Sequence, residues 1–200
     1  MTGVVLASGN AGKLDELRRL LGPAGFELKL QSEFGIDGVD ETGATFVENA
    51  LLKARHAAVA SGCPAIADDS GLEVPALNGA PGIHSARYAG RHGDDAANNR
   101  RLLEALGGFH GGDRDAHFRC VLVYLRHAAD PAPVVAEGVW RGRILTEPRG
   151  SGGFGYDPLF LDPETGKTGA ELSPERKNVL SHRGQALRAL LAALADQSVV

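Results

Sequence analysis

Cysteine and net basic charge are both scarce in this 200-residue sequence. Two cysteines, Cys63 and Cys120, are too few for a disulfide framework and lack any paired zinc spacing, so we expect buried free thiols. The chain carries 25 acidic against 21 basic residues, a formal charge of -4. It therefore lacks the broad basic surface that binds nucleic acid or an anionic membrane, and an anionic ligand would need cations placed locally.

Long apolar runs and metal-binding histidine patterns are also missing. No stretch approaches the roughly 18 apolar residues of a membrane span, and residues 1–7 have neither the basic start nor the length of a signal peptide. We therefore expect a cytoplasmic protein that binds neither a membrane nor nucleic acid. The seven histidines form no HExxH or related pattern, which argues against a zinc enzyme.

The sequence does contain 43% hydrophobic residues, arranged as apolar runs that alternate with helical patterns. This content suits a single domain over residues 1–200, and the alternation predicts the α/β class. The predicted strands are 4–7, 26–30, 65–67, 118–126 and 134–144, and the predicted helices are 11–21, 45–62, 94–106 and a last one from about 181. Crossover helices together with a hairpin at Asp130-Pro131 predict a mixed sheet.

The first candidate site is the break between the apolar run "VVLA" and the helical pattern that follows it. A strand that ends in "SGN", residues 8–10, just before a helix presents free backbone N–H groups at the helix N-terminus, where phosphate binds. Lys13 adds a full positive charge there. The stretch is not a Walker P-loop, because Ala7 and Leu14 stand where that motif needs glycine and serine or threonine. The alternative is that its glycines only shape a tight turn.

The second candidate is "AIADDSGLEV", residues 65–74, in which a strand runs into the adjacent carboxylates of Asp68 and Asp69. Adjacent carboxylates repel each other unless a cation or hydrogen-bond donors compensate them. Mg²⁺ suits such a pair because it takes one or two carboxylates and keeps phosphate oxygens and water as its other ligands. Glu41 is a candidate second ligand. The alternative for the pair is an Asx turn or a cap.

Two further stretches contain candidate ligand-binding groups. In "GSGGFGYDPLF", residues 150–160, glycines flank two aromatic residues, and an exposed aromatic ring can stack on a nucleobase. Asp157 in this loop is able to accept hydrogen bonds from a base edge. In "ERKNVLSHRGQAL", residues 175–187, basic residues gather near the start of the last helix. The alternatives are aromatic rings that enter the core and charges that are solvated on the surface.

Together these stretches resemble the inosine/xanthosine triphosphate pyrophosphatase family, whose members hydrolyse non-standard purine nucleoside triphosphates. The resemblance covers nearly the whole chain, in the family's order, through "SGN" with "GK" and Glu16, "ETGATFVENALLKA", "ADDSGLEVPALNGAPGIHSARYAG", "GGFGYDPLF" and "SHRGQAL". It implies an elongated α/β fold, with a long mixed sheet flanked by helices, two lobes, a central active-site cleft and a homodimer. The implied house-cleaning reaction converts a triphosphate and water to the monophosphate and pyrophosphate, with Mg²⁺.

The resemblance also implies a role for each matching residue. Asp69 is the implied proton acceptor, Asp68 assists it, and Glu41 and Asp69 hold Mg²⁺. Ser70 is implied to contact the substrate. The implied phosphate-binding residues are Ser8, Gly9, Asn10, Ala11, Gly12, Lys13 and Lys53. The implied base-binding residues are Phe154, Gly155, Tyr156, Asp157, Lys177, His182 and Arg183.

Two other function classes compete with this interpretation. A related pyrophosphatase for pyrimidine or modified triphosphates would keep the phosphate and metal residues but change "FGYD" and "SHR". A non-catalytic nucleotide sensor would lose the metal carboxylates, whereas Glu41, Asp68 and Asp69 are all present. We therefore expect hydrolysis of ITP, dITP and XTP. Donors near the last helix would favour a 6-oxo group over the 6-amino group of adenine.

Overall fold

The computed structural model describes residues 2–8 and 11–197, and the chain divides into two compact units. The first unit comprises Met1–Asp69, Cys120–Gly138 and Arg183–Val200. The second unit comprises Ser70–Arg119 and Val139–His182. The chain passes between the units four times, three times within a strand and once at the start of the last helix, so three strands supply residues to both units.

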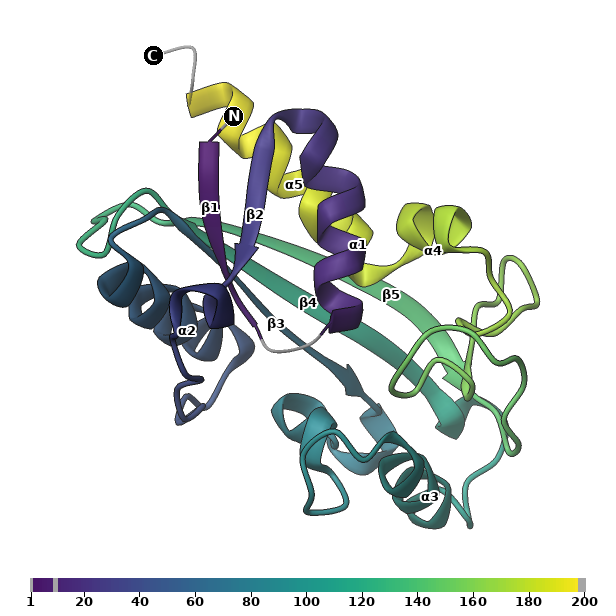
Figure 1. The fold of residues 1–200 in the computed structure, drawn as a ribbon. Helices are drawn as coiled ribbons and strands as arrows, with labels where there is room; N and C mark the ends of the chain where they lie inside the picture. The colour runs from purple at the N-terminus through teal and green to yellow at the C-terminus, as the bar shows by residue number, and fades with distance from the viewer. Residues whose placement is uncertain (1, 9–10, 198–200) are drawn as a thin grey trace. The chain divides into compact units, whose positions relative to one another are not determined.

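The strands form one mixed sheet with the order β2-β1-β3-β4-β5-β6 (Figure 1). They are β1 (Thr2–Ala7), β2 (Phe26–Leu30), β3 (Ala65–Glu73), β4 (Asp115–Leu125), β5 (Val134–Ile144) and β6 (Phe160–Leu161). Strand β1 pairs in parallel with β2 and β3, whereas β5 and β6 are antiparallel. The predicted α/β class and mixed sheet are confirmed.

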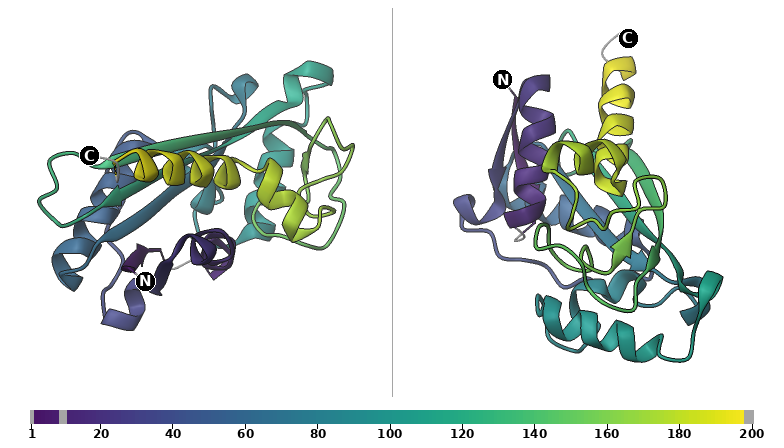
Figure 2. Two further views of the ribbon diagram at one scale, coloured as in Figure 1. Left: turned by 90° about the horizontal axis from the view of Figure 1, so that it is seen from above. Right: turned by 90° about the vertical axis from the view of Figure 1, so that its right-hand side faces the viewer.

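The first unit contains α1 (Ala11–Leu21), α2 (Phe46–Ser61) and, from Arg183 on, α5 (His182–Gln197). Helices α1 and α5 both pack onto one apolar cluster, and Figures 1 and 2 show them from three sides. Every third or fourth residue of these helices is apolar, which lets one face be buried. Members of the cluster are Val4, Leu6, Leu14, Leu17, Leu21, Ile66, Leu122, Leu187 and Leu190.

Helix α2 begins and ends where the sequence predicts. Thr45 is its N-cap and accepts a hydrogen bond from Glu48 N–H at 3.3 Å. The Glu48 carboxylate returns to the N–H of Ala44 at 2.8 Å, one residue earlier than in a standard capping box. Gly62 ends the helix with a φ of 67°, a left-handed conformation that glycine adopts without strain.

The second unit contains α3 (Asp95–Ala105), α4 (Pro174–Leu180) and the carboxyl-terminal part of β3. Its core is rich in aromatic rings, and Phe118 lies 4.7 Å from Phe160, centroid to centroid. Aromatic pairs at this spacing add stability beyond the area that they bury. The core residues include Leu72, Leu102, Leu106, Phe118, Trp140, Ile144, Tyr156 and Phe160.

Several predicted boundaries are wrong. Strand β3 runs to Glu73 instead of stopping at residue 67, so the acidic pair lies within a strand and not in an Asx turn. Strand β4 begins three residues earlier than predicted, at Asp115. Helix α4 and strand β6 are absent from the prediction. The signal for α4 was present, since Ser173 caps Arg176 N–H and Pro174 occupies the first turn.

The two cysteines differ in burial. Cys63 is half-buried and Cys120 is buried, and both are free thiols, so the predicted burial is confirmed for Cys120 alone. Within the described residues, every helix is too short or too polar to cross a membrane.

Candidate active site

Asp68 lies in β3 with a fully buried side chain, and positively charged groups surround it. Its Oδ1 accepts a hydrogen bond from Lys13 Nζ at 2.5 Å, and its Oδ2 accepts one from Arg183 Nε at 2.7 Å. Arg183 is also buried and donates to Glu16 through Nη1. Burial opposes ionisation of Asp68, but Arg183 and Lys13 outweigh it and hold the pKa of this carboxyl well below its usual range. Asp68 is therefore the ionised centre of a buried ion-pair network.

Asp69, the next residue, has different partners. Lys53 Nζ from α2 donates to Asp69 Oδ1 at 2.6 Å and to Glu41 Oε1 at 2.7 Å. Successive residues of a strand point to opposite faces, which explains why the two aspartates bind different cations. Burial raises the pKa of Asp69 by more than the Lys53 ammonium lowers it. Two adjacent carboxyls with pKa values shifted in opposite directions are typical of acid–base sites.

Helix α2 positions both Lys53 and the loop that carries Glu41. Asn49, one turn before Lys53, accepts a hydrogen bond from Gly43 N–H at 2.8 Å, two residues beyond Glu41. A Cβ atom on Gly43 would lie 2.7 Å from both Asn49 Oδ1 and Glu48 Cβ, so only glycine fits here without a shift. The loop therefore packs tightly on the first turns of α2, which brings Glu41 to Lys53.

The free oxygen of Asp69 tests whether these residues suit a metal. Asp69 Oδ2 is buried and has no hydrogen-bond partner within residues 2–8 and 11–197. A buried carboxylate oxygen needs a cation, a donor or water. Across the same residues, no three side chains of His, Cys, Asp and Glu gather as a metal cage. Glu41 and Asp69 thus fit Mg²⁺, which needs only one or two carboxylates when phosphate and water supply the rest.

The predicted phosphate turn is described at both of its ends. Ser8 directly follows β1, and α1 begins three residues later, so the predicted order of a strand ahead of a helix is confirmed. The Lys13 ammonium contacts Asp68, which places it in the same ion-pair network of the first unit. The described members of the turn are Ser8, Ala11, Gly12 and Lys13, while Gly9 and Asn10 lie outside the described residues.

The predicted base-binding loop belongs to the second unit and is closed by its own hydrogen bonds. Asp157 is buried and accepts hydrogen bonds from Phe154 N–H at 2.9 Å and from Lys177 Nζ at 2.6 Å. Lys177 Nζ also lies 4.8 Å from the centroid of the half-buried Phe154 ring, a cation–π contact. Tyr156 instead enters the core, where its hydroxyl donates to the Ser85 carbonyl at 2.8 Å. Of the two aromatic rings, Phe154 is the one that stays partly exposed.

Three of the four basic residues near the start of the last helix are not solvated surface charges, whereas the fourth, Arg176, is exposed. Lys177, His182 and Arg183 are all buried, which rules out that alternative for these three. The His182 ring stacks on Phe118 with centroids 4.7 Å apart and an interplanar angle of 11°. Ser70, the predicted substrate contact in β3, is half-buried.

Three residues that contact the predicted site had no sequence signal. Cys120 Sγ lies 3.4 Å from Asp68 Oδ2, and Asp95 and Asn99 of α3 hydrogen-bond the backbone of Gly155. These partners are separated by 52 to 60 positions in the chain. Helical and strand periodicity reports only local spacing, so a single sequence does not reveal such pairs.

We expect Gly153→Ala to destabilise the second unit through the base-binding loop. Gly153 has a φ of 70°, and an added Cβ would lie 2.1 Å from Asp157 Oδ2. The left-handed conformation costs about 1–2 kcal/mol, and displacing Asp157 adds ~1–3 kcal/mol. Gly166→Ala is the matched control, because Gly166 has a φ of 66° but open space around it. Denaturant titration should show a larger loss of unfolding free energy for Gly153→Ala than for Gly166→Ala. Equal losses in the two variants would contradict the predicted clash with Asp157.

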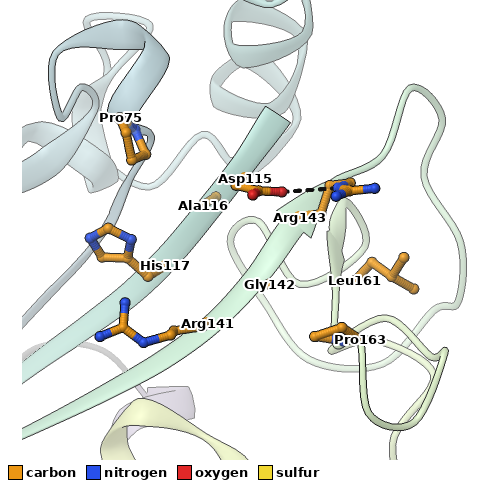
Figure 3. A pocket seen from close by; sticks show the side chains of 9 residues that line it. All are labelled: Pro75, Asp115, Ala116, His117, Arg141, Gly142, Arg143, Leu161 and Pro163. Carbon is orange, nitrogen blue, oxygen red and sulfur yellow. Dashed lines mark hydrogen bonds and ion pairs between the residues drawn. The ribbon is translucent and has the colours of Figure 1, made fainter. Parts of the chain in front are cut away.

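Figure 3 shows a cavity of about 490 Å³ in the second unit. An ion pair between Arg143 Nε and Asp115 Oδ1, 3.0 Å apart, occupies one side, and His117 and Arg141 lie together on the other. The lining residues, all in the described part of the chain, are Pro75, Asp115, Ala116, His117, Arg141, Gly142, Arg143, Leu161 and Pro163. They include no predicted site residue, so this cavity is separate from the predicted base-binding loop.

The sequence has close relatives along its whole length. Residues 4–193 match the Ham1 family. The dITP/XTP pyrophosphatase of Thioalkalivibrio sulfidiphilus is 61% identical over 191 residues, which cover 96% of this chain and 97% of that protein. The dITP/XTP pyrophosphatase of Halorhodospira halophila is 62% identical over 194 residues, covering 97% and 98%.

The fold agrees with solved structures of the same kind. The structure of a HAM1 protein from Coxiella burnetii is 50% identical in sequence and matches with a TM-score of 0.90 over 98% of this chain and 100% of that one. The resemblance inferred from the phosphate turn, the acidic pair and the glycine-rich loop is therefore confirmed. With residues 4–193 matched and the same fold present, this chain belongs to the Ham1 family.

Proposed function

We propose that this chain is a nucleoside triphosphate pyrophosphatase that hydrolyses dITP, XTP and ITP to the monophosphate and pyrophosphate, which removes deaminated purines from the nucleotide pool. Two relatives named dITP/XTP pyrophosphatase, 61% and 62% identical, support this substrate class. The observation that carries the chemistry is Asp69, whose Oδ1 is held by Lys53 while its buried Oδ2 has no partner among the described residues. The proposal takes residues 1–200 as one functional domain, acting in the cytoplasm as a homodimer.

The first unit supplies the groups for phosphate and metal in this proposal. Glu41 and Asp69 would hold Mg²⁺, which when bound neutralises phosphate charge and lowers the pKa of a water molecule. Lys53 fixes both carboxylates at 2.6 to 2.7 Å and supplies a positive charge for the phosphates. The proposed phosphate contacts are Ser8, Gly9, Asn10, Ala11, Gly12, Lys13 and Lys53.

Asp69 is the proposed proton acceptor. A water oxygen forms the new bond to the α-phosphorus, the α–β phosphoanhydride bond breaks, and its electron pair leaves with pyrophosphate. The water proton passes to Asp69, whose pKa is raised by burial, which makes its carboxylate a stronger base than an ordinary one. Asp68 is proposed to assist by keeping Lys13 and Arg183 in place, 2.5 and 2.7 Å away.

The proposed base contacts are mostly in the second unit. The half-buried ring of Phe154 provides a stacking surface, and Lys177 and His182 supply donors for a 6-oxo group. A donor that faces the 6-amino group of adenine finds no acceptor, which disfavours ATP and dATP. Further proposed contacts are Ser70, Gly155, Tyr156, Asp157 and Arg183.

We expect the purified protein to release pyrophosphate from dITP and XTP in the presence of Mg²⁺. We expect kcat/KM for dATP and dCTP to be at least ~100-fold lower, since mismatched hydrogen-bonding groups discriminate strongly. Chelation with EDTA should abolish turnover. The measurement is coupled pyrophosphate detection over a panel of triphosphates. Preference for dCTP would indicate the pyrimidine class, and binding without pyrophosphate release would indicate a sensor.

A further inference from the structure

Helix α3 holds the middle of the base-binding loop through two side chains of its amino-terminal half. Gly155 N–H donates to Asp95 Oδ2 at 2.6 Å, and Asn99 Nδ2 donates to the Gly155 carbonyl at 2.8 Å. Both backbone polar groups of one residue are thus bound by one helix. Asp95 and Asn99 are one helical turn apart and therefore lie on the same face. Asn99 Nδ2 also donates to the Asp95 carbonyl at 2.8 Å, which fixes the orientation of the amide.

Gly155, which these two residues hold, has no side chain to restrict its backbone conformation. Gly155 has a φ of 61° and nothing lies within 4 Å of the position of an added Cβ, so its own sterics do not restrict the backbone. The flanking residues are fixed by other contacts, Phe154 through Asp157 and Tyr156 through Ser85. The Phe154 carbonyl of the Phe154–Gly155 peptide also accepts a hydrogen bond from Asp157 N–H at 3.2 Å, so the hydrogen bonds from α3 act together with this turn to set the direction of the peptide.

One polar atom of the Asn99 side chain lowers the stability of the fold. Its Oδ1 is buried and has no hydrogen-bond partner in the described ranges 2–8 and 11–197. A buried amide oxygen without a partner lowers stability, so an apolar side chain of similar size would serve better for packing alone. The hydrogen bond from the Asn99 amide to the Gly155 carbonyl therefore points to a role in holding Gly155.

We propose that Asp95 and Asn99 are positioning residues for base recognition, which hold the Gly155 peptide so that the neighbouring Phe154 ring keeps the orientation that accepts a purine. The inference rests on the proposed function, because it assigns the base to this loop. If the hydrogen bonds from Asp95 and Asn99 to Gly155 are lost, only a fraction of the molecules has the loop conformation that binds the base. The apparent affinity for the substrate then falls by that fraction. KM for dITP should then rise while kcat stays near its normal value.

The test compares Asn99→Leu with Asp95→Asn and Asp95→Ala. Leucine keeps the side-chain size, has a higher helix propensity than asparagine, and removes both donated hydrogen bonds. In Asp95→Asn an amide oxygen can still accept from Gly155 N–H, so this variant should retain most of the function that Asp95→Ala loses. The control is Arg100→Ala, since Arg100 is exposed on the same helix.

We expect Asn99→Leu and Asp95→Ala to raise KM for dITP about tenfold, to change kcat less than about twofold, and to narrow the dITP-to-dATP ratio of kcat/KM. Amide hydrogen exchange of the peptide covering 152–157 should become faster in both variants and remain unchanged in Arg100→Ala. Unchanged KM and exchange in folded variants would overturn the proposal. So would a fall in kcat at constant KM, because a base-positioning role predicts the opposite.

Two further outcomes are also decisive. If Asn99→Leu unfolds, the pair Asp95→Asn and Asp95→Ala carries the test, since both keep the Asn99 amide. If the wild-type protein does not hydrolyse dITP, the proposed function fails. Hydrogen exchange then tests by itself whether Asp95 and Asn99 hold the Gly155 peptide. Faster exchange at 152–157 in the variants supports this role, and unchanged exchange overturns it.

Discussion

Asp69→Asn should lower kcat for dITP by about 10²–10⁴-fold, the usual effect of losing a general base, with little change in the melting temperature of the metal-free protein. The substitution keeps the shape of the side chain but removes its charge and basicity. Stability is spared because burial already disfavours the charged form of Asp69 and raises its pKa. Lys53 also keeps a charged partner, since Glu41 Oε1 lies 2.7 Å from Nζ.

The measurement is kcat across a Mg²⁺ titration, together with a thermal melt in EDTA. Asp115→Asn is the control, because this carboxylate is 59% exposed and lines the cavity that contains no predicted site residue. Full recovery of kcat at high Mg²⁺ would mean that Asp69 is only a metal ligand and that the base is another residue. A much lower melting temperature of the metal-free variant would mean that the Asp69 carboxylate is needed for the stability of the fold.

The local features of this fold were predictable from the sequence. The cap at Thr45, the stop at Gly62 and strand β5 lie where residue spacing places them, because each depends on neighbours a few positions away. The extent of β3 was not predictable, since two aspartates in a row favour a turn. They are tolerated in a strand because Lys13, Lys53 and Arg183 arrive from distant segments.

The candidate site was predicted as a set of residues and not as a set of contacts. The motif resemblance singled out Arg183 for base recognition, whereas the structure shows its guanidinium bonded to Asp68 and Glu16. Both interactions span more than a hundred positions of sequence. A basic residue in a polar segment looks solvated until its partner is known, because Arg is rarely buried unless it is paired. Its role in the ion-pair network therefore follows from contacts between distant segments, which residue spacing does not reveal.

Asp68→Asn, unlike Asp69→Asn, should cause a large loss of unfolding free energy. Asp68 separates Lys13 Nζ and Arg183 Nε, at 2.5 and 2.7 Å, and the Arg183 side chain is 2% exposed. Arg183 still has Glu16, but the buried network loses the carboxylate that pairs with both Lys13 and Arg183, and breaking a buried ion pair costs about 3–5 kcal/mol. For a chain of this size, that loss lowers the melting temperature by roughly 6–20 °C. Asp115→Asn breaks an exposed pair and should cost less than about 1 kcal/mol.

The pH dependence of this loss identifies its electrostatic origin. Because Arg183 and Lys13 hold the pKa of Asp68 well below its unfolded value of about 3.9, the stability that Asp68 contributes is fully present above that pH. It is lost as the pH falls through the folded-state pKa. The difference in unfolding free energy between wild type and Asp68→Asn should therefore be constant from about pH 5 to 7 and shrink below about pH 4. The raised pKa of Asp69 has the opposite slope but is present in both proteins, so it cancels in the difference. Denaturant titrations in EDTA at several pH values measure this difference. A loss that is independent of pH would assign the effect to packing, and a loss no larger than that of Asp115→Asn would show that the buried network does not stabilise the fold.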